Sequence, residues 1–75
     1  MDEFRVRFGR RVRQLREARG LSQQQLADAV SINLTHLSNI ENGRYGIRFS
    51  RLETLASALS CELADLFTFD PPESG

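Results

Sequence analysis

The sequence predicts an all-α fold: a compact domain of five helices over residues 1–69, followed by a polar tail at 70–75. Apolar residues recur at intervals of three and four, which is the period of a helix that buries one face. Serine, asparagine and glycine stand where these periodic stretches begin and end. No stretch alternates apolar and polar residues as a strand would. Seventy-five residues allow one core and are too few for two.

The first two helices are predicted at residues 3–19 and 23–30. The first carries an apolar stripe at spacings of four and three, formed by Phe4, Phe8, Val12 and Leu15. Gly20 is placed to end it as a C-terminal cap. Ser22, followed three residues later by Gln25, is a capping-box pattern for the second helix. Its inward residues are Leu26, Ala27 and Val30.

The third helix is predicted at residues 34–42. Residues 31–33 break the apolar period, and Asn33 is a good N-cap for a new helix. Gly43 ends that helix. Its core-facing residues are Leu37 and Ile40.

A loop at residues 44–48 leads to the last two helices, because that segment holds one apolar residue and a glycine. The fourth helix has an apolar stripe consisting of Phe49, Leu52, Leu55, Ala56 and Leu59. Ser50 with Glu53 is a second possible capping box. A short fifth helix covers residues 62–67, and the two prolines of the tail predict disorder at 70–75.

Composition excludes several classes of protein. One cysteine, Cys61, and one histidine, His36, can form neither an intramolecular disulfide nor a structural zinc site with four protein ligands. The acidic start is unlike a signal peptide, and no long apolar segment follows, so we expect a soluble, cytoplasmic protein. No second histidine and no glycine-rich phosphate loop is present. We therefore expect no enzyme activity, no cofactor, no metal and no small-molecule ligand.

The formal net charge is zero, but the charge is unevenly distributed. Residues 1–20 hold seven arginines against three carboxylates, a net charge of +4. Residues 51–75 hold one arginine against five carboxylates, a net charge of −4. A folded chain of this kind can turn its basic end toward a polyanion. The arginine run is equally typical of the solvated face of an amphipathic helix, so charge alone leaves both interpretations open.

Two short helices joined by three residues follow the plan of a helix-turn-helix, here at about residues 22–42. In that motif the second helix enters the major groove of B-DNA, where side chains near its N-terminus meet base edges. The outward positions of this helix are mostly polar, as base or phosphate contact requires: Leu34, Thr35, His36, Ser38 and Asn39. The sequence therefore predicts a protein that binds double-stranded DNA.

Five stretches of the chain resemble the Xre family of regulators, relatives of the Cro and CI phage repressors. The two most specific are Leu21-Ser22-Gln23-Gln24-Gln25-Leu26-Ala27 and Leu37-Ser38-Asn39-Ile40-Glu41-Asn42-Gly43-Arg44. The others are residues 10–16, 52–59 and 63–67, and all align without a gap over residues 8–67. The resemblance implies a lambda-repressor-like fold and a transcriptional regulator, with repression and activation both open.

The resemblance also assigns roles to individual positions. It implies four base-reading residues: Gln23, Leu34, Thr35 and Asn39. It implies phosphate contacts through the backbone amides of Ser22 and Asn42 and through His36, Ser38, Arg44 and Arg48. It further implies a partly buried ion pair between the first and third helices, Arg16 with Glu41.

The chain departs from the family pattern at several positions. Ser31 replaces the usual glycine of the turn, which implies either a serine at positive φ or a turn of different shape. Ser60 replaces another glycine. Arg48 stands where a serine usually caps the fourth helix, and Gly46-Ile47 replaces Asn-Pro, so the loop after the third helix transfers least. Cys61 occupies an apolar family position, which implies packing in the core.

We expect a homodimer that binds an approximately palindromic operator, because one half-site offers few specific contacts. The expected dimer surface is the fifth helix and the residue that follows it, with Leu63, Leu66, Phe67 and Phe69. For the two phenylalanines, closure of the monomer core is an equal alternative. Two other functions compete: an antitoxin that also binds a toxin protein, and a protein-interaction module of the same fold.

Overall fold

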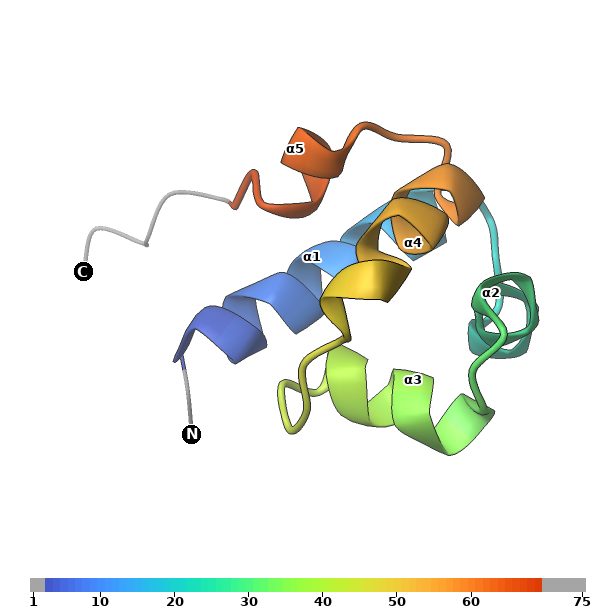
Figure 1. Cartoon of the computed structure of the whole chain (residues 1–75), viewed down its shortest axis with the longest axis horizontal. Coiled ribbons are helices and arrows are strands. Elements are labelled where there is room, and N and C mark those ends of the chain that lie inside the picture. The colour runs from blue at the N-terminus through green and yellow to red at the C-terminus, as the bar shows by residue number, and fades with distance from the viewer. Residues whose placement is uncertain (1–2, 70–75) are drawn as a thin grey trace.

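Five α-helices and one 3₁₀ turn make up the regular structure of the computed structural model, which describes residues 3–69 (Figure 1). The expected disordered tail, 70–75, lies outside the described residues. The turn, η1, leads directly into the fourth helix. The elements in chain order are α1 (Glu3–Ala18), α2 (Gln23–Val30), α3 (Leu34–Glu41), η1 (Phe49–Arg51), α4 (Leu52–Ala58) and α5 (Leu63–Leu66). The prediction of an all-α, five-helix domain is confirmed.

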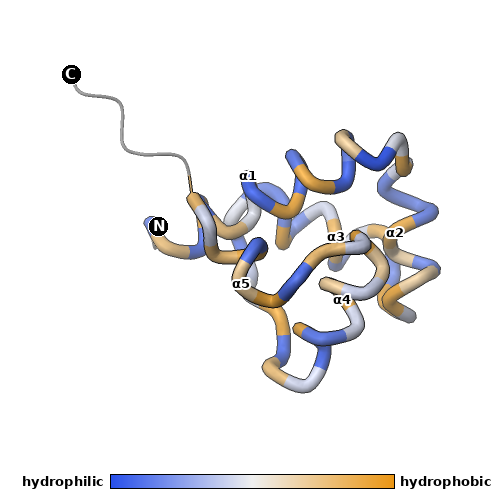
Figure 2. Tube along the Cα trace, turned by 90° about the horizontal axis from the view of Figure 1, so that it is seen from above, coloured by the Kyte–Doolittle hydropathy of each residue, from blue (hydrophilic) through white to orange (hydrophobic). Residues whose placement is uncertain are grey.

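The long helix α1 runs along the molecule and packs against both α3 and α5 (Figure 1). The α2 helix packs on α3 and α4, which closes a single core. Along α1, hydrophobic and hydrophilic segments follow one another at the helical period (Figure 2), as expected for a helix with one buried face. Every helix contributes to the core, whose members are Phe8, Val12, Leu26, Ala27, Val30, Leu37, Ile40, Leu55, Ala56, Leu59 and Leu66.

The helix starts of α2 and α3 are fixed by the caps predicted for them. The Ser22 hydroxyl accepts a hydrogen bond from the Gln25 amide at 3.0 Å, and the Gln25 side chain accepts one from the Ser22 amide at 2.8 Å. The Asn33 side chain accepts a hydrogen bond from the His36 amide at 2.7 Å. Because the caps set where each helix begins, they also set the three-residue turn between them.

The start of α4 differs from the prediction. The chain enters this helix through η1 and no side chain caps it, so the suggested Ser50 capping box is wrong. Phe49 is 89% exposed, so its assignment to the buried stripe is also wrong. Burial declines from Leu55, which is fully buried, through half-buried Leu52 to Phe49. The axis of α4 therefore leads out of the core toward its N-terminus.

Both serines that replace family glycines adopt left-handed backbone conformations. Ser31 has φ 61° and ψ 43°, and Ser60 has φ 54°. The Ser31 amide donates to the carbonyls of Ala27 and Asp28 and so ends α2. The left-handed region is disfavoured for residues with a Cβ atom. The turn therefore has the shape that glycine normally supplies, at some cost in strain.

Replacing Ser31 by glycine should stabilise the fold by up to about 1 kcal/mol, because relief of the strain exceeds the entropy that glycine adds to the unfolded chain. Urea unfolding followed by circular dichroism measures the change. Ser57→Gly is the matched control: it lies in a regular helical conformation within α4, so the same substitution should destabilise by roughly 0.5–1 kcal/mol there. Equal destabilisation by both variants would show that the turn is not strained.

A buried ion pair joins α1 to α3. The Arg16 side chain donates from Nε to Glu41 Oε2 at 2.7 Å and from Nη2 to Glu41 Oε1 at 3.1 Å. Both residues are more than nine-tenths buried, at 8% and 7% exposure. Arg16 Nη1 also donates to the Leu21 carbonyl at 2.8 Å. The hydrogen bonds to Glu41 raise the pKa of Arg16 above its usual value despite the opposing effect of burial. This is the pair that the family resemblance implies.

Loss of one partner should be far more damaging than loss of both. Arg16→Met should destabilise the fold by about 3 kcal/mol because it leaves a buried carboxylate unpaired, and Arg16→Met/Glu41→Leu should recover part of that loss. Arg13→Met is the control, since Arg13 forms a 3.6 Å surface pair with Glu17, worth roughly 0.5 kcal/mol. Urea titration provides all three values. Equal effects of Arg16→Met and Arg13→Met would contradict a buried pair.

Candidate nucleic-acid interface

The α3 helix presents one polar face to the outside. Its opposite face buries Leu37, Ile40 and Glu41. Thr35 and Asn39 are four residues apart and share the outward side, because four residues nearly complete one helical turn. Thr35 is exposed and Asn39 is half-buried. An exposed helix face with a hydroxyl and an amide on successive turns has the groups needed to meet base edges in a major groove.

Leu34 begins α3 and is 40% exposed, so its side chain is available at the N-terminal end of the helix. His36 and Ser38 are half-buried and flank the line through Thr35 and Asn39. The sequence-predicted set on α3 therefore lies together on the outer side of one helix, with Leu34 as its apolar member. A leucine here can contact a thymine methyl group but cannot form a hydrogen bond to a base.

Gln23 lies at the start of α2, close to the end of α3. Its Nε2 atom donates to Glu41 Oε1 at 3.0 Å, so one of its polar atoms is held by the buried ion pair. The side chain keeps its carbonyl oxygen as an acceptor. Gln23 thus has a defined orientation at the junction of α1, α2 and α3.

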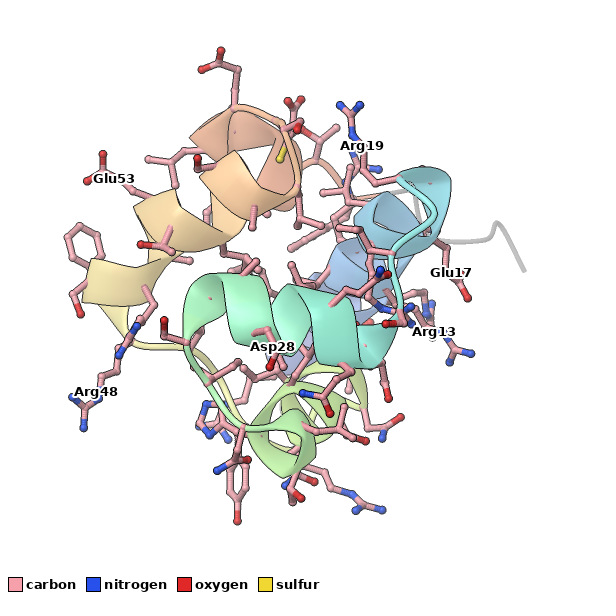
Figure 3. The ribbon with its side chains drawn as sticks, turned by 90° about the vertical axis from the view of Figure 1, so that its right-hand side faces the viewer. Arg13, Glu17, Arg19, Asp28, Arg48 and Glu53 are labelled. Atoms are coloured by element: carbon pink, nitrogen blue, oxygen red, sulfur yellow. The ribbon has the colours of Figure 1, made fainter. Side chains whose placement is uncertain are left out.

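The backbone amides expected to bind phosphate are engaged within the protein. The Ser22 amide donates to Gln25 Oε1, and the Asn42 amide donates to the Ser38 carbonyl at 3.0 Å. Arg44 and Arg48 are exposed in the loop after α3. Figure 3 shows Arg48 extending from that loop away from the helices. The guanidinium groups of this loop are consequently the most accessible phosphate ligands near α3.

Tyr45 is a member of this surface that sequence analysis missed. Its ring stacks on His36 with the ring centroids 6.3 Å apart and the planes 20° apart. It is 56% exposed. The Tyr45 amide lies 3.4 Å from the Asn39 carbonyl, which holds the loop against the end of α3. The available signal was its identity: it is the only tyrosine of the chain and stands in a polar loop.

Several arginines of the N-terminal run bond to other segments of the fold. Arg11 donates to the Asp65 carbonyl at 2.7 Å, and Arg19 donates to the carbonyls of Leu59 and Ser60 at 3.0 and 2.8 Å. In Figure 3, Arg13 and Glu17 lie near each other, and Arg19 lies apart from them toward the top of the view. Three arginines of the run, Arg11, Arg16 and Arg19, therefore bond to other segments of the fold, which neither interpretation of the charge had anticipated.

The expected dimer residues do not share one environment. Leu63 and Phe67 are 42% and 40% exposed, and Phe69 is half-buried. Leu66 is fully buried in the monomer core and presents no surface to a partner. Phe67 stacks on Phe8 with ring centroids 5.4 Å apart, so it closes part of the core and still reaches the outside.

The segment of residues 3–69 contains no group of three histidine, cysteine, aspartate or glutamate side chains able to hold a metal ion. None of its helices has the length and apolar character needed to cross a membrane. Cys61 is half-buried against the core, as expected, and its burial together with Asp65 raises the pKa of its thiol.

Known proteins resemble this chain over most of its length. It is 44% identical over 60 residues to the competence pilus inhibition repressor of Acinetobacter baylyi, covering 80% of this chain and 54% of that protein. The chain thus spans about half the length of that repressor. It is 33% identical over 69 residues to the control protein C.MunI of a Mycoplasma species, covering 91% of this chain and 93% of that protein.

A solved structure of a controller protein also resembles this chain over most of its length. The restriction-modification controller protein C.AhdI from Aeromonas hydrophila superposes with a TM-score of 0.84 and 35% identity, covering 88% of this chain and all of that one. The family model of the helix-turn-helix domain matches residues 7–69, which is nearly all of the described structure. The chain therefore belongs to the helix-turn-helix domain family.

Proposed function

We propose that this protein is a transcriptional regulator that reads a palindromic operator in double-stranded DNA as a homodimer. The observation that carries the proposal is the outer face of α3, where Thr35 and Asn39 stand on successive turns with arginines in the adjoining loop. Regulators of this family are not enzymes, and this one would act in the cytoplasm, where the DNA lies. Similarity to both repressors and controller proteins is compatible with repression or autoregulation.

The residues divide into two roles in this proposal. Thr35 and Asn39 read bases, Leu34 contacts a thymine methyl group, and Gln23 accepts a hydrogen bond near the same groove. Arg44 and Arg48 bind phosphates and set the register of α3 without specifying sequence. His36, Ser38, Ser22 and Asn42 line the edge of the contact. With their amides engaged, Ser22 and Asn42 act through their side chains.

Asn39→Ala should relax the preference for one base pair in each half-site, because a good bidentate contact to adenine discriminates by about 1–3 kcal/mol. Arg44→Ala should weaken binding to all sequences and reduce the slope of log K against log salt by about one. Selection of bound sequences from a random duplex pool, followed by titrations across a salt series, measures both effects.

The control for these variants is Thr54→Ala, on an exposed part of α4 remote from α3 in the fold. It should leave both the selected sequence and the salt slope unchanged. If the wild-type protein selects no sequence and binds only weakly and in a salt-sensitive manner, the operator proposal fails. The protein-interaction alternative would then explain the fold better.

Tyr45 should contribute to operator binding through its ring and its hydroxyl. Tyr45→Phe keeps the stack on His36 and removes one hydrogen-bonding group, so we expect about a fivefold loss of affinity, near 1 kcal/mol. Tyr45→Ala also removes the stack and should cost more, with altered preference beside His36. Competition titrations with single-base operator variants provide the comparison. Wild-type behaviour of Tyr45→Ala would remove Tyr45 from the contact surface.

A further inference from the structure

An open apolar groove of about 340 Å³ lies on the side of the molecule away from α2. The start of α1, the loop after α3 and the end of α5 enclose it, and these segments lie in the left-hand half of Figure 1. Most of its lining is aromatic or aliphatic: Phe4, Phe8, Ile47, Phe49, Leu52 and Phe67. Aromatic rings stack along its wall, with the centroids of Phe4 and Phe67 6.2 Å apart.

Phe49 stands at the edge of this groove and projects into solvent. At 89% it is the most exposed of the large apolar side chains in residues 3–69. A single exposed apolar side chain is ordinary, but one beside a preformed apolar groove marks an interaction surface. The exposed Phe49 ring therefore lies next to the apolar groove on the same surface of the molecule.

We propose that the occupant of the groove is a second copy of this chain, with Phe49 of each copy inserted into the groove of the other. A two-fold axis requires the same patch to be complementary to itself. Because Phe49 projects beside the groove, one two-fold arrangement can insert the Phe49 ring of each copy into the groove of the other. This inference rests on the proposed homodimer and names its contact. It replaces the outer face of α5, including buried Leu66, as the centre of the expected interface.

Residues 70–75 are a poor alternative occupant. They contain two prolines and no larger aliphatic or aromatic side chain, so they cannot fill an apolar groove of this size. The dimensions of the molecule favour a second copy. Its long axis measures 37 Å, so two copies joined at one end have centres separated by about one turn of B-DNA, roughly 34 Å. Such a pair can place both α3 helices over successive half-sites.

Sedimentation equilibrium of the full chain without DNA tests this contact. Phe49→Ser should weaken the dimer by roughly 30-fold or more, as expected for a buried aromatic anchor. Because Phe49 is exposed in the monomer, the variant should fold normally, which circular dichroism verifies. Ile47→Trp attacks the same contact from the other side by filling the groove, and it should also weaken the dimer. Leu63→Ser is the matched control on the exposed face of α5, and its dimer should remain within about threefold of wild type.

Two results would overturn the inference. In the first, Leu63→Ser weakens the dimer and Phe49→Ser does not, which would place the contact on α5. In the second, the wild-type protein stays monomeric at high concentration and on its operator, so that the groove has another occupant. Selection of a DNA sequence by the wild-type protein tests the regulator proposal independently of the Phe49 variants. Failure of the Phe49 contact is therefore distinguishable from failure of the regulator proposal.

Discussion

The close docking of α1 on α3 is the constraint on which the rest of the structure depends. A Cβ atom at Gly9 would come within 2.2 Å of the Ile40 carbonyl oxygen, so only glycine allows the two helices to approach this closely. About two turns farther along α1, Arg16 reaches Glu41. Glu41 also accepts from Gln23, so a single buried carboxylate connects α1, α2 and α3. The orientation of α3 is thereby fixed from inside the protein.

Arginine has a second structural role in this chain, at the ends of helices. The last carbonyls of a helix lack internal partners, and a cationic donor there also opposes the negative end of the helix dipole. Arg51 donates to the Val30 carbonyl at the end of α2, and Arg19 donates to carbonyls just beyond α4. The fold is thus held partly by long side chains that bridge segments distant in the sequence.

Local features were predictable from the sequence, and features set by tertiary packing were not. The caps at Ser22 and Asn33 depend on the residues immediately around them, and the positive φ of Ser31 follows from a family glycine. The same periodic logic misassigned Phe49, because a stripe of apolar residues does not reveal where a helix leaves the core. Leu66, the last residue of α5, and its neighbour Phe67 have opposite environments. Tyr45 was missed because its partner, His36, is nine residues away across a loop.

The loop from Gly43 to Phe49 joins the two proposed contacts of the molecule. Its first half carries Arg44 and Tyr45 against the end of α3, and its second half forms one wall of the apolar groove. Gly43 fixes its origin: a Cβ atom there would come within 2.8 Å of the Val6 Cα atom, and the φ of 75° also disfavours a side chain. A partner copy that holds the second half would restrict the first half as well. Dimerisation and DNA binding then favour the same loop conformation, so each must strengthen the other by the same factor.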